Sequence, residues 1–247
     1  MKNFSETTMR VDASKTDIKF NLSLTGILEI MEDAQTIHTG EMKVDAPTLK
    51  KYDNAFWVIT RNYIHINRLP HFEENLIVGT YPLKPTVIRS ERQNYINDAD
   101  GNNLISGKTE WCALDCDSRK IRTFNSLKTY PRDLQHKTER ILSSFPALPN
   151  FTPDESDFVY SRLIRTTDLD FNLHVNNVKY ANYIIDCFPS SFWMQNSVTD
   201  IKIDYLNECK EAETMKLYAR QTDNVLFVCG KTEDKTIFSA AAVLKRN

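Results

Sequence analysis

The feature of this sequence that most constrains its fold is an internal repeat. Residues 17–26 (DIKFNLSLTG) match residues 168–177 (DLDFNLHVNN), and each copy lies just before a segment with helical spacing of apolar residues. A turn-rich stretch at residues 143–157, which contains three prolines, separates the copies. A repeat on this scale indicates a duplicated structural unit. We therefore predict one unit in residues 1–142, a linker in residues 143–157 and a second unit in residues 158–247.

Each unit is predicted to contain one helix followed by antiparallel strands. In the first unit, residues 24–38 have the apolar spacing of a helix, and Gly40 is placed to end it. In the second unit, a similar stripe over residues 178–188 stops before Pro189. Predicted strands cover residues 56–67, 76–81, 87–96, 104–114, 199–205, 215–222, 225–232 and 236–245. Because helices do not alternate with strands, we predict an α+β fold in which two copies of a helix wrapped by a curved sheet pack together.

Composition and charge exclude several classes of protein. Hydrophobic residues make up 41% and aromatic residues 11% of the chain, which argues against wholesale disorder. The 31 basic and 33 acidic residues give a net charge of −2, so we expect no nucleic-acid partner and no bulk attraction to an anionic membrane. The longest apolar runs are far shorter than the roughly 20 residues of a membrane span, and residues 1–10 lack a signal-peptide pattern.

Cysteine and histidine usage predicts neither disulfides nor a metal. The five cysteines are an odd number, which favours free thiols in a reducing cytosol. Cys112 and Cys116 are expected to share one face of a strand and to pack in the core. The five histidines are scattered and form no recognised ligand spacing, so we predict no metal and no cofactor.

The repeat also provides an internal control for chemistry, because positions that differ between the copies carry what one unit alone does. The letter match places Asp170 opposite Lys19 and His174 opposite Ser23. A carboxylate and an imidazole in one loop form a candidate acid/base pair. The role of Asn172 stays open, because Asn21 stands opposite it and an amide can simply satisfy a turn.

A second alignment supports the same asymmetry. Residues 61–71 run beside residues 200–210, which places Leu69-Pro70 opposite Glu208-Cys209. Here the second unit has a carboxylate and a thiol where the first has two apolar side chains. We therefore predict one active unit and one degenerate unit.

The residues of the second unit resemble a known enzyme family. Residues 167–180 (TDLDFNLHVNNVKY) are similar to the Asp-x-Asn-x-His-Val-Asn-Asn motif of the acyl-acyl carrier protein (acyl-ACP) thioesterases, and the 34-residue step from His174 to Glu208 resembles the spacing in that family. Further likenesses are FWVITR at 56–61, EWCAL at 110–114 and SRKI at 118–121. The resemblance implies two tandem hotdog domains. It also implies hydrolysis of a fatty acyl thioester on acyl carrier protein, which ends fatty acid synthesis.

The same resemblance suggests a setting for the enzyme. Plant members of the family carry an N-terminal transit segment, and the absence of such a pattern here points to a bacterial cytoplasmic enzyme. Acyl carrier protein is the expected partner, and a homodimer is compatible with the sequence. Three other functions stay open: an acyl-CoA thioesterase, a non-catalytic acyl-binding hotdog protein and a dehydratase of hydroxyacyl chains.

The resemblance also assigns the site residues, each with a structural alternative. The candidate catalytic residues are Asp170, Asn172, His174 and Glu208, with Cys209 as an accessory. Asp170 could instead form a turn, Glu208 could be a solvated carboxylate and Cys209 could simply pack. Two mechanisms are possible, with either Cys209 or a water molecule as the nucleophile. We favour water, because the neighbouring carboxylate of Glu208 disfavours a thiolate.

A group of basic residues in the first unit is the candidate docking surface for an acidic carrier protein. Its alternative is an ordinary solvated face. The group comprises Arg89, Arg92, Arg119, Lys120 and Arg122.

Overall fold

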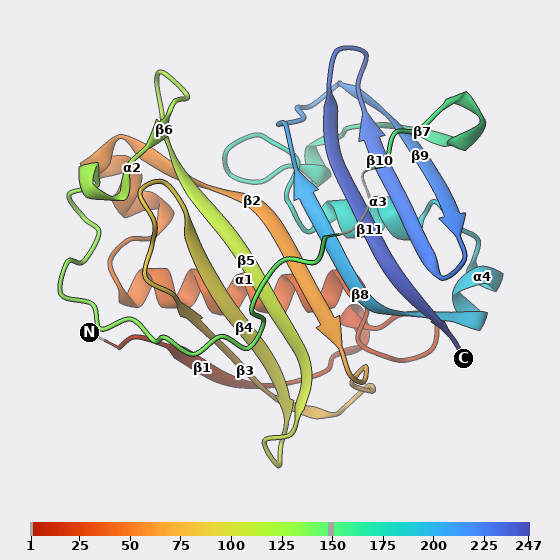
Figure 1. The fold of residues 1–247 in the computed structure, drawn as a ribbon, viewed down its shortest axis with the longest axis horizontal. Helices are drawn as coiled ribbons and strands as arrows, with labels where there is room; N and C mark the ends of the chain where they lie inside the picture. Colours follow the sequence, from red (N-terminus) through yellow and green to blue (C-terminus); the bar gives the residue numbers. More distant parts are fainter. Residues whose placement is uncertain (1, 148–150) are drawn as a thin grey trace.

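A computed structural model describes residues 2–147 and 151–247 of the chain (Figure 1). Residues 148–150 of the predicted linker therefore lie outside the described residues. One antiparallel sheet runs through both halves of the molecule in the order β1-β3-β4-β5-β2-β8-β11-β10-β9-β7, with β6 paired to β5. The division at residues 143–157 stays a prediction, because a single sheet joins the two units.

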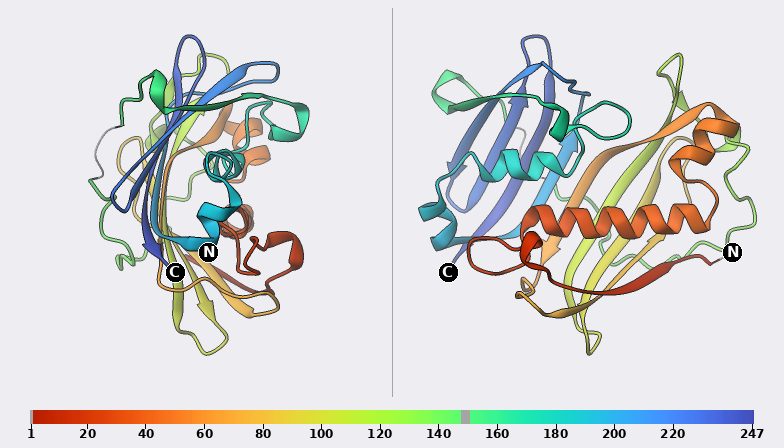
Figure 2. Two further views of the ribbon diagram at one scale, coloured as in Figure 1. Left: turned by 90° about the vertical axis from the view of Figure 1, so that its right-hand side faces the viewer. Right: turned by 180° about the vertical axis from the view of Figure 1, so that it is seen from behind.

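The first unit contains two helices and six strands. Its long helix α1 lies against one face of the sheet, and the chain after β6 crosses the opposite face (Figures 1 and 2). The elements are β1 (Ser5–Arg10), α1 (Leu24–Glu41), α2 (Ala46–Asp53), β2 (Ala55–Ile66), β3 (Asn75–Pro82), β4 (Ser90–Asp98), β5 (Asn103–Asp115) and β6 (Ile121–Arg122).

The second unit repeats this arrangement with a shorter helix. Helix α3 lies on the same side of the sheet as α1 (Figure 2). The elements are β7 (Phe158–Leu163), α3 (Lys179–Ile185), α4 (Ser190–Gln195), β8 (Asn196–Tyr205), β9 (Thr214–Thr222), β10 (Val225–Lys231) and β11 (Thr236–Arg246). The eight predicted strands are all present, whereas β1, β6, β7, α2 and α4 were missed because they are short and partly exposed.

The ends of the two main helices differ from prediction. Gly40 does not end α1, which continues to Glu41, and the left-handed residue after the helix is Lys43 at φ 57°. The amide of Met42 bonds back to the carbonyl oxygens of His38 and Gly40 and so closes the last turn. Helix α3 ends at Ile185 rather than at Phe188, and the residues before Pro189 form tighter turns.

The two units meet where β2 pairs with β8. Arg61 lies opposite Asp204, Tyr63 opposite Lys202 and His65 opposite Asp200. This register agrees with the alignment of residues 61–71 with 200–210, because the pairing maps onto itself when the units are exchanged. His65 Nδ1 lies 2.7 Å from Asp200 Oδ1, and Arg61 pairs with Asp204, so two polar bridges flank the centre of the junction.

All five cysteines are free. Cys112 is buried on β5 as predicted, but Cys116 lies beyond the end of that strand in a turn and is half-buried. The prediction that the two cysteines share a strand face is therefore wrong. Among the described residues, no helix is both long enough and apolar enough to cross a membrane.

Candidate active site

Three of the predicted site residues, Asp170, Asn172 and His174, lie on a tight loop that leads into α3, whereas Glu208 and Cys209 lie beyond the end of β8. Asp170 donates its amide to the carbonyl oxygen of His174 (2.8 Å), and Leu173 donates its amide to Asp170 (3.0 Å). Leu173 has a φ of 64°, a left-handed conformation that is uncommon for a leucine. The Asp170 carboxylate accepts the amides of Asn172 (2.8 Å) and His174 (3.3 Å). The loop is therefore an Asx-type turn that holds the backbone of Asn172 and His174.

The first unit contains the same loop, and its geometry corrects the alignment of the repeat. The left-handed residue there is Phe20 at φ 60°, which lies 153 positions before Leu173, whereas the letter match pairs residues 151 positions apart. Asp17 donates its amide to the Asn21 carbonyl oxygen (2.7 Å), and its carboxylate accepts the Lys19 and Asn21 amides (2.8 and 3.0 Å). The similar letters are therefore out of register by two residues.

The corrected register changes which differences between the units matter. Asp170 is equivalent to Asp17, so the carboxylate belongs to the shared turn. Asn172 is equivalent to Lys19 and His174 to Asn21, so both are specific to the second unit. The Asp170 carboxylate bonds the backbone amide of His174, and within the described residues no hydrogen bond joins that carboxylate to the imidazole. The pairing of Asp170 and His174 as acid and base stays a prediction.

The residue opposite Ser23 is Asn176, and the two share a structural role. The Ser23 hydroxyl accepts the amide of Gly26 (3.0 Å) at the start of α1. The Asn176 side chain accepts the amide of Val178 (2.8 Å) at the start of α3. Ser23 is the N-cap of α1, whereas Asn176 forms a turn just before α3, whose N-cap residue Val178 has no side-chain cap. Both side chains accept a backbone amide where the loop meets its helix, so Ser23 is not the counterpart of His174.

The imidazole of His174 faces Glu208 and a residue of the first unit. His174 Nε2 lies 3.3 Å from Glu208 Oε2. Arg119 Nη2 contacts the same carboxylate oxygen and lies 3.4 Å from His174 Nε2. Lys235 holds the backbone of Glu208 in place, because its Nζ donates to the Glu208 carbonyl oxygen at 2.7 Å. The structure thus brings His174 and Glu208 together, as predicted, and adds Arg119.

The electrostatic surroundings of His174 favour its neutral form. Burial lowers the pKa of His174 below its ordinary value, and the positive charges of Arg119 and Lys210 lower it further. The carboxylates of Glu208 and Asp170 act in the opposite direction. A neutral imidazole can accept a proton, which is what a general base requires.

Cys209 lies beside Glu208 but points into the protein. Its side chain is 0% exposed, and burial raises the pKa of its thiol to about 12, with a further contribution from Glu213. Its carbonyl oxygen accepts the amide of Val175 (2.9 Å) and so ties the loop to the strand end. A buried, protonated thiol is a poor nucleophile.

Glu32 is a candidate site residue that the sequence did not reveal. It lies on α1 of the first unit, close enough to Asp170 for the two charges to interact. Burial, followed by the charges of Asp33 and Asp170, raises the pKa of Glu32 to about 7. It also borders a cavity of only about 10 Å³ that reaches Asn177 and Val178 beyond the catalytic loop. Within one sequence, no local pattern distinguishes it from the other carboxylates of a helix surface.

The five basic residues predicted to dock a carrier protein do not form one surface. Arg92 is 4% exposed and its guanidinium lies 2.6 Å from His38 Nδ1, so its inclusion in a docking surface is wrong. Arg89 pairs with the buried Glu110 (2.7 Å), and Arg122 turns inward to Asp115 (3.2 Å).

A cavity lies beside the loop of the first unit. It has a volume of about 530 Å³ and is lined by Lys19 and Leu69 from that unit and by Ile185 and Trp193 from the other. Lys19 Nζ donates to the carbonyl oxygen of Asn196 (3.1 Å) across this space. The loop of the first unit therefore borders a larger space than the cavity that reaches Asn177 and Val178.

Comparison with known proteins gives two family matches. A model of the acyl-ACP thioesterase N-terminal domain matches residues 2–126, and a model of the acyl-ACP thioesterase C-terminal domain matches residues 152–242. The oleoyl-acyl carrier protein thioesterase of Coriandrum sativum is 27% identical over 68% of this chain and 48% of its own length. The palmitoyl-acyl carrier protein thioesterase of Arabidopsis thaliana is 25% identical over 63% and 39%. The chain thus spans about half or less of the length of these curated relatives.

Solved structures show the same fold. An acyl-ACP thioesterase from Bacteroides thetaiotaomicron superposes with a TM-score of 0.83 at 17% identity and covers 98% of each chain. The 12:0-ACP thioesterase from Umbellularia californica gives a TM-score of 0.83 at 15% identity, over 100% of this chain and 99% of that one. The predicted α+β tandem hotdog fold is confirmed.

Proposed function

The chain belongs to the acyl-ACP thioesterase family, and we propose that it hydrolyses the thioester that joins a fatty acyl chain to acyl carrier protein. The products are a free fatty acid and the carrier thiol, so the reaction ends chain elongation. The observation that carries this proposal is the contact between His174 and Glu208, with Asn172 on the same loop as His174. The first unit has Asn21, Leu69 and Lys19 at the equivalent positions.

In the proposed mechanism, a water molecule is the nucleophile. The short distance between His174 Nε2 and Glu208 Oε2 (3.3 Å) lets both atoms bind one water. His174 accepts a proton as the water oxygen bonds to the carbonyl carbon, and Glu208 orients the water. When the carbon–sulfur bond breaks, the proton passes from His174 to the thiolate. The low pKa of a thiol makes this sulfur a good leaving group, so no covalent enzyme intermediate is required.

Asn172 and Asp170 take supporting roles in this proposal. The Asn172 side chain lies 3.4 Å from the Asp170 carboxylate, so one of its N–H groups is oriented and the other is free to polarise the thioester carbonyl. Asp170 shapes the loop through the backbone. Cys209 acts as an accessory that anchors the loop, and its high pKa argues against the thiol route.

The proposed partner is acyl carrier protein, and Arg89 and Lys120 are the part of the predicted docking group that we retain for it. We also propose a cytoplasmic location, which the five free cysteines support because a reducing compartment keeps thiols unpaired. A homodimer stays a prediction, which the molar mass from light scattering would test.

The decisive experiment measures free fatty acid released from a set of acyl-ACP substrates that differ in chain length. We expect release by the wild type and a large loss in His174→Ala. The same chain lengths on CoA test the acyl-CoA alternative. Equal kcat/KM on both carriers would remove carrier protein from the proposal, and no release from either would overturn the activity.

A further inference from the structure

Arg119 reaches the site from the other unit of the molecule. It lies in the turn between β5 and β6 at φ 58°, and its amide donates to the Asp115 carbonyl oxygen (3.1 Å). Its guanidinium lies over the ring of Phe56, with 4.6 Å between the guanidinium carbon and the ring centroid. From there one nitrogen, Nη2, meets both Glu208 and His174. A site built on the second unit is thus completed by the first.

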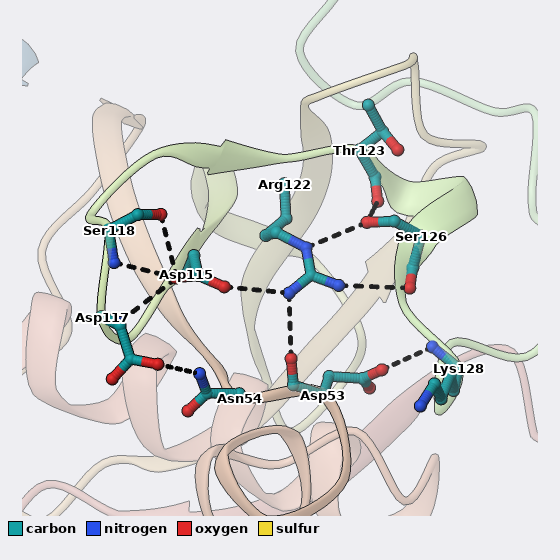
Figure 3. Close-up of polar contacts among 9 residues, drawn as sticks. All are labelled: Asp53, Asn54, Asp115, Asp117, Ser118, Arg122, Thr123, Ser126 and Lys128. Atoms are coloured by element: carbon teal, nitrogen blue, oxygen red, sulfur yellow. Dashed lines mark hydrogen bonds and ion pairs between the residues drawn. The ribbon is translucent and has the colours of Figure 1, made fainter.

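The turn that carries Arg119 is braced on both sides (Figure 3). Asp115 Oδ1 accepts the Ser118 amide (2.9 Å) and hydroxyl (2.9 Å), and these bonds hold the pKa of Asp115 below its ordinary value. The other oxygen, Oδ2, accepts Arg122 Nη1 at 3.2 Å. Asn54, which follows α2, donates to Asp117 at 2.6 Å. Contacts from β5, from β6 and from the residue after α2 therefore fix the turn.

Arg122 links this brace to the body of the first unit. Its Nη1 also donates to the Asp53 carbonyl oxygen (3.0 Å), and its Nε donates to the Ser126 hydroxyl (3.1 Å), as Figure 3 shows. Preorganisation of this kind is what a side chain needs if it is to set the geometry of a second group.

We propose that Arg119 is a positioning residue of the thioesterase site, which holds the Glu208 carboxylate beside Nε2 of His174 from across the junction between the units. This inference rests on the proposed function. The unprotonated nitrogen of a neutral imidazole has one lone pair, and the water needs it to pass on its proton. Arg119 therefore acts on His174 through the Glu208 carboxylate and through its own positive charge.

The sign of the effect on His174 follows from the charges that face it. These are Glu208 and Lys210 beyond the end of β8, Asp170 on its own loop and Arg119 on the β5–β6 turn. Removing the positive charge of Arg119 makes the imidazolium less unfavourable. The pKa of His174 then rises, and less of the neutral base is present at a given pH below that pKa.

The test compares three variants of the full chain. Arg119→Ala removes the contact, and Arg119→Lys keeps the charge without the planar guanidinium. The control, Arg10→Ala, removes an arginine on β1 that forms an exposed ion pair with Glu73. NMR follows the imidazole titration of His174, and steady-state kinetics follow kcat and KM on an acyl-ACP. Unchanged thermal unfolding shows that each variant folds, and Arg119→Gln replaces the alanine variant if it does not.

We expect Arg119→Ala to raise the titration midpoint of His174 and to move the acid limb of kcat to higher pH. We also expect kcat to fall by about 10- to 100-fold with KM nearly unchanged, since misplacing a catalytic group by about 1 Å can cost 10²-fold. In Arg119→Lys, which keeps the positive charge, the acid limb of kcat should lie close to that of the wild type, whereas kcat itself should stay reduced. Arg10→Ala should change neither.

Two results would overturn the inference: an unmoved His174 titration in Arg119→Ala, or a moved titration with full kcat on a substrate that the wild type hydrolyses. A wild type that hydrolyses no thioester would overturn the proposed activity instead. In that case the NMR titration still decides whether Arg119 acts on His174.

Discussion

The two helix-entry loops share a backbone conformation but present different side chains. Each loop has an Asx-type turn and a left-handed residue, and each is hydrogen-bonded to the segment that follows the first strand after its helix. Lys19, Asn21 and Leu69 of the first unit stand where the second has Asn172, His174 and Glu208. A carboxylate common to both loops is a turn former, and the side chains found in one loop are the candidates for chemistry.

The first unit also contributes side chains to the candidate site of the second unit. Arg119 contacts Glu208, and Glu32 lies close enough to Asp170 for the two charges to interact. Ile185 occupies the position in α3 that corresponds to Glu32 in α1, and it lines the cavity of about 530 Å³ beside the loop of the first unit. At this position, therefore, only the helix of the first unit carries a carboxylate.

The largest expected effect separates the two loops directly. His174→Ala and Glu208→Ala should each lower kcat/KM on acyl-ACP by about 10²–10⁴-fold, the usual worth of a general acid or base. Asn21→Ala and Leu69→Ala, the equivalent changes in the first unit, should leave it within about twofold of the wild type. Similar losses in both pairs, measured by fatty acid release, would mean that the first loop is not degenerate.

The sequence predicted the features that depend on patterns along the chain, and it did not predict those that depend on turn geometry or on contacts between distant residues. The duplication, the eight long strands and the alignment of residues 61–71 with 200–210 came from patterns that strands impose over many residues. The loop register was wrong by two residues, because φ angles and turn hydrogen bonds set it while similar letters suggested another alignment. Glu32 was not predicted at the site and Arg119 was predicted only for docking, because both residues approach the site through space from the other unit.

The second prediction tests whether the shared carboxylate is a turn former in both units. Asp17→Ala and Asp170→Ala should each reduce the free energy of unfolding by about 1 kcal/mol, which is the net contribution of a typical hydrogen bond. Only Asp170→Ala should also lower kcat, by about 10- to 100-fold, because the loop it releases carries Asn172 and His174. Denaturant unfolding and turnover, measured on both variants, separate the two effects. A loss in Asp170→Ala as large as in His174→Ala would restore a direct chemical role.

The third prediction concerns the thiol that faces the core. Cys209→Ala should keep turnover within about tenfold of the wild type, which corresponds to at most about 1.4 kcal/mol of transition-state stabilisation. The reason is that burial keeps the thiol protonated, with a pKa raised to about 12. Pro70→Ala in the first unit is the matched change and should leave turnover as it is. An acyl group trapped on Cys209 and seen by mass spectrometry would contradict the water mechanism.

The smallest expected effect on turnover comes from the helix cap of the first loop. Ser23→Ala removes the hydroxyl that accepts the Gly26 amide, and a lost cap of this kind costs about 0.5–2 kcal/mol. For a chain of this size, that corresponds to a fall in Tm of about 2–4 °C per kcal/mol. Turnover should not change, because the cap acts on α1 and the loop carries no reacting group. Calorimetry and fatty acid release measure the two quantities separately. A stable Ser23→Ala protein with impaired turnover would show that the first loop takes part in catalysis, and the division of labour between the loops would then be wrong.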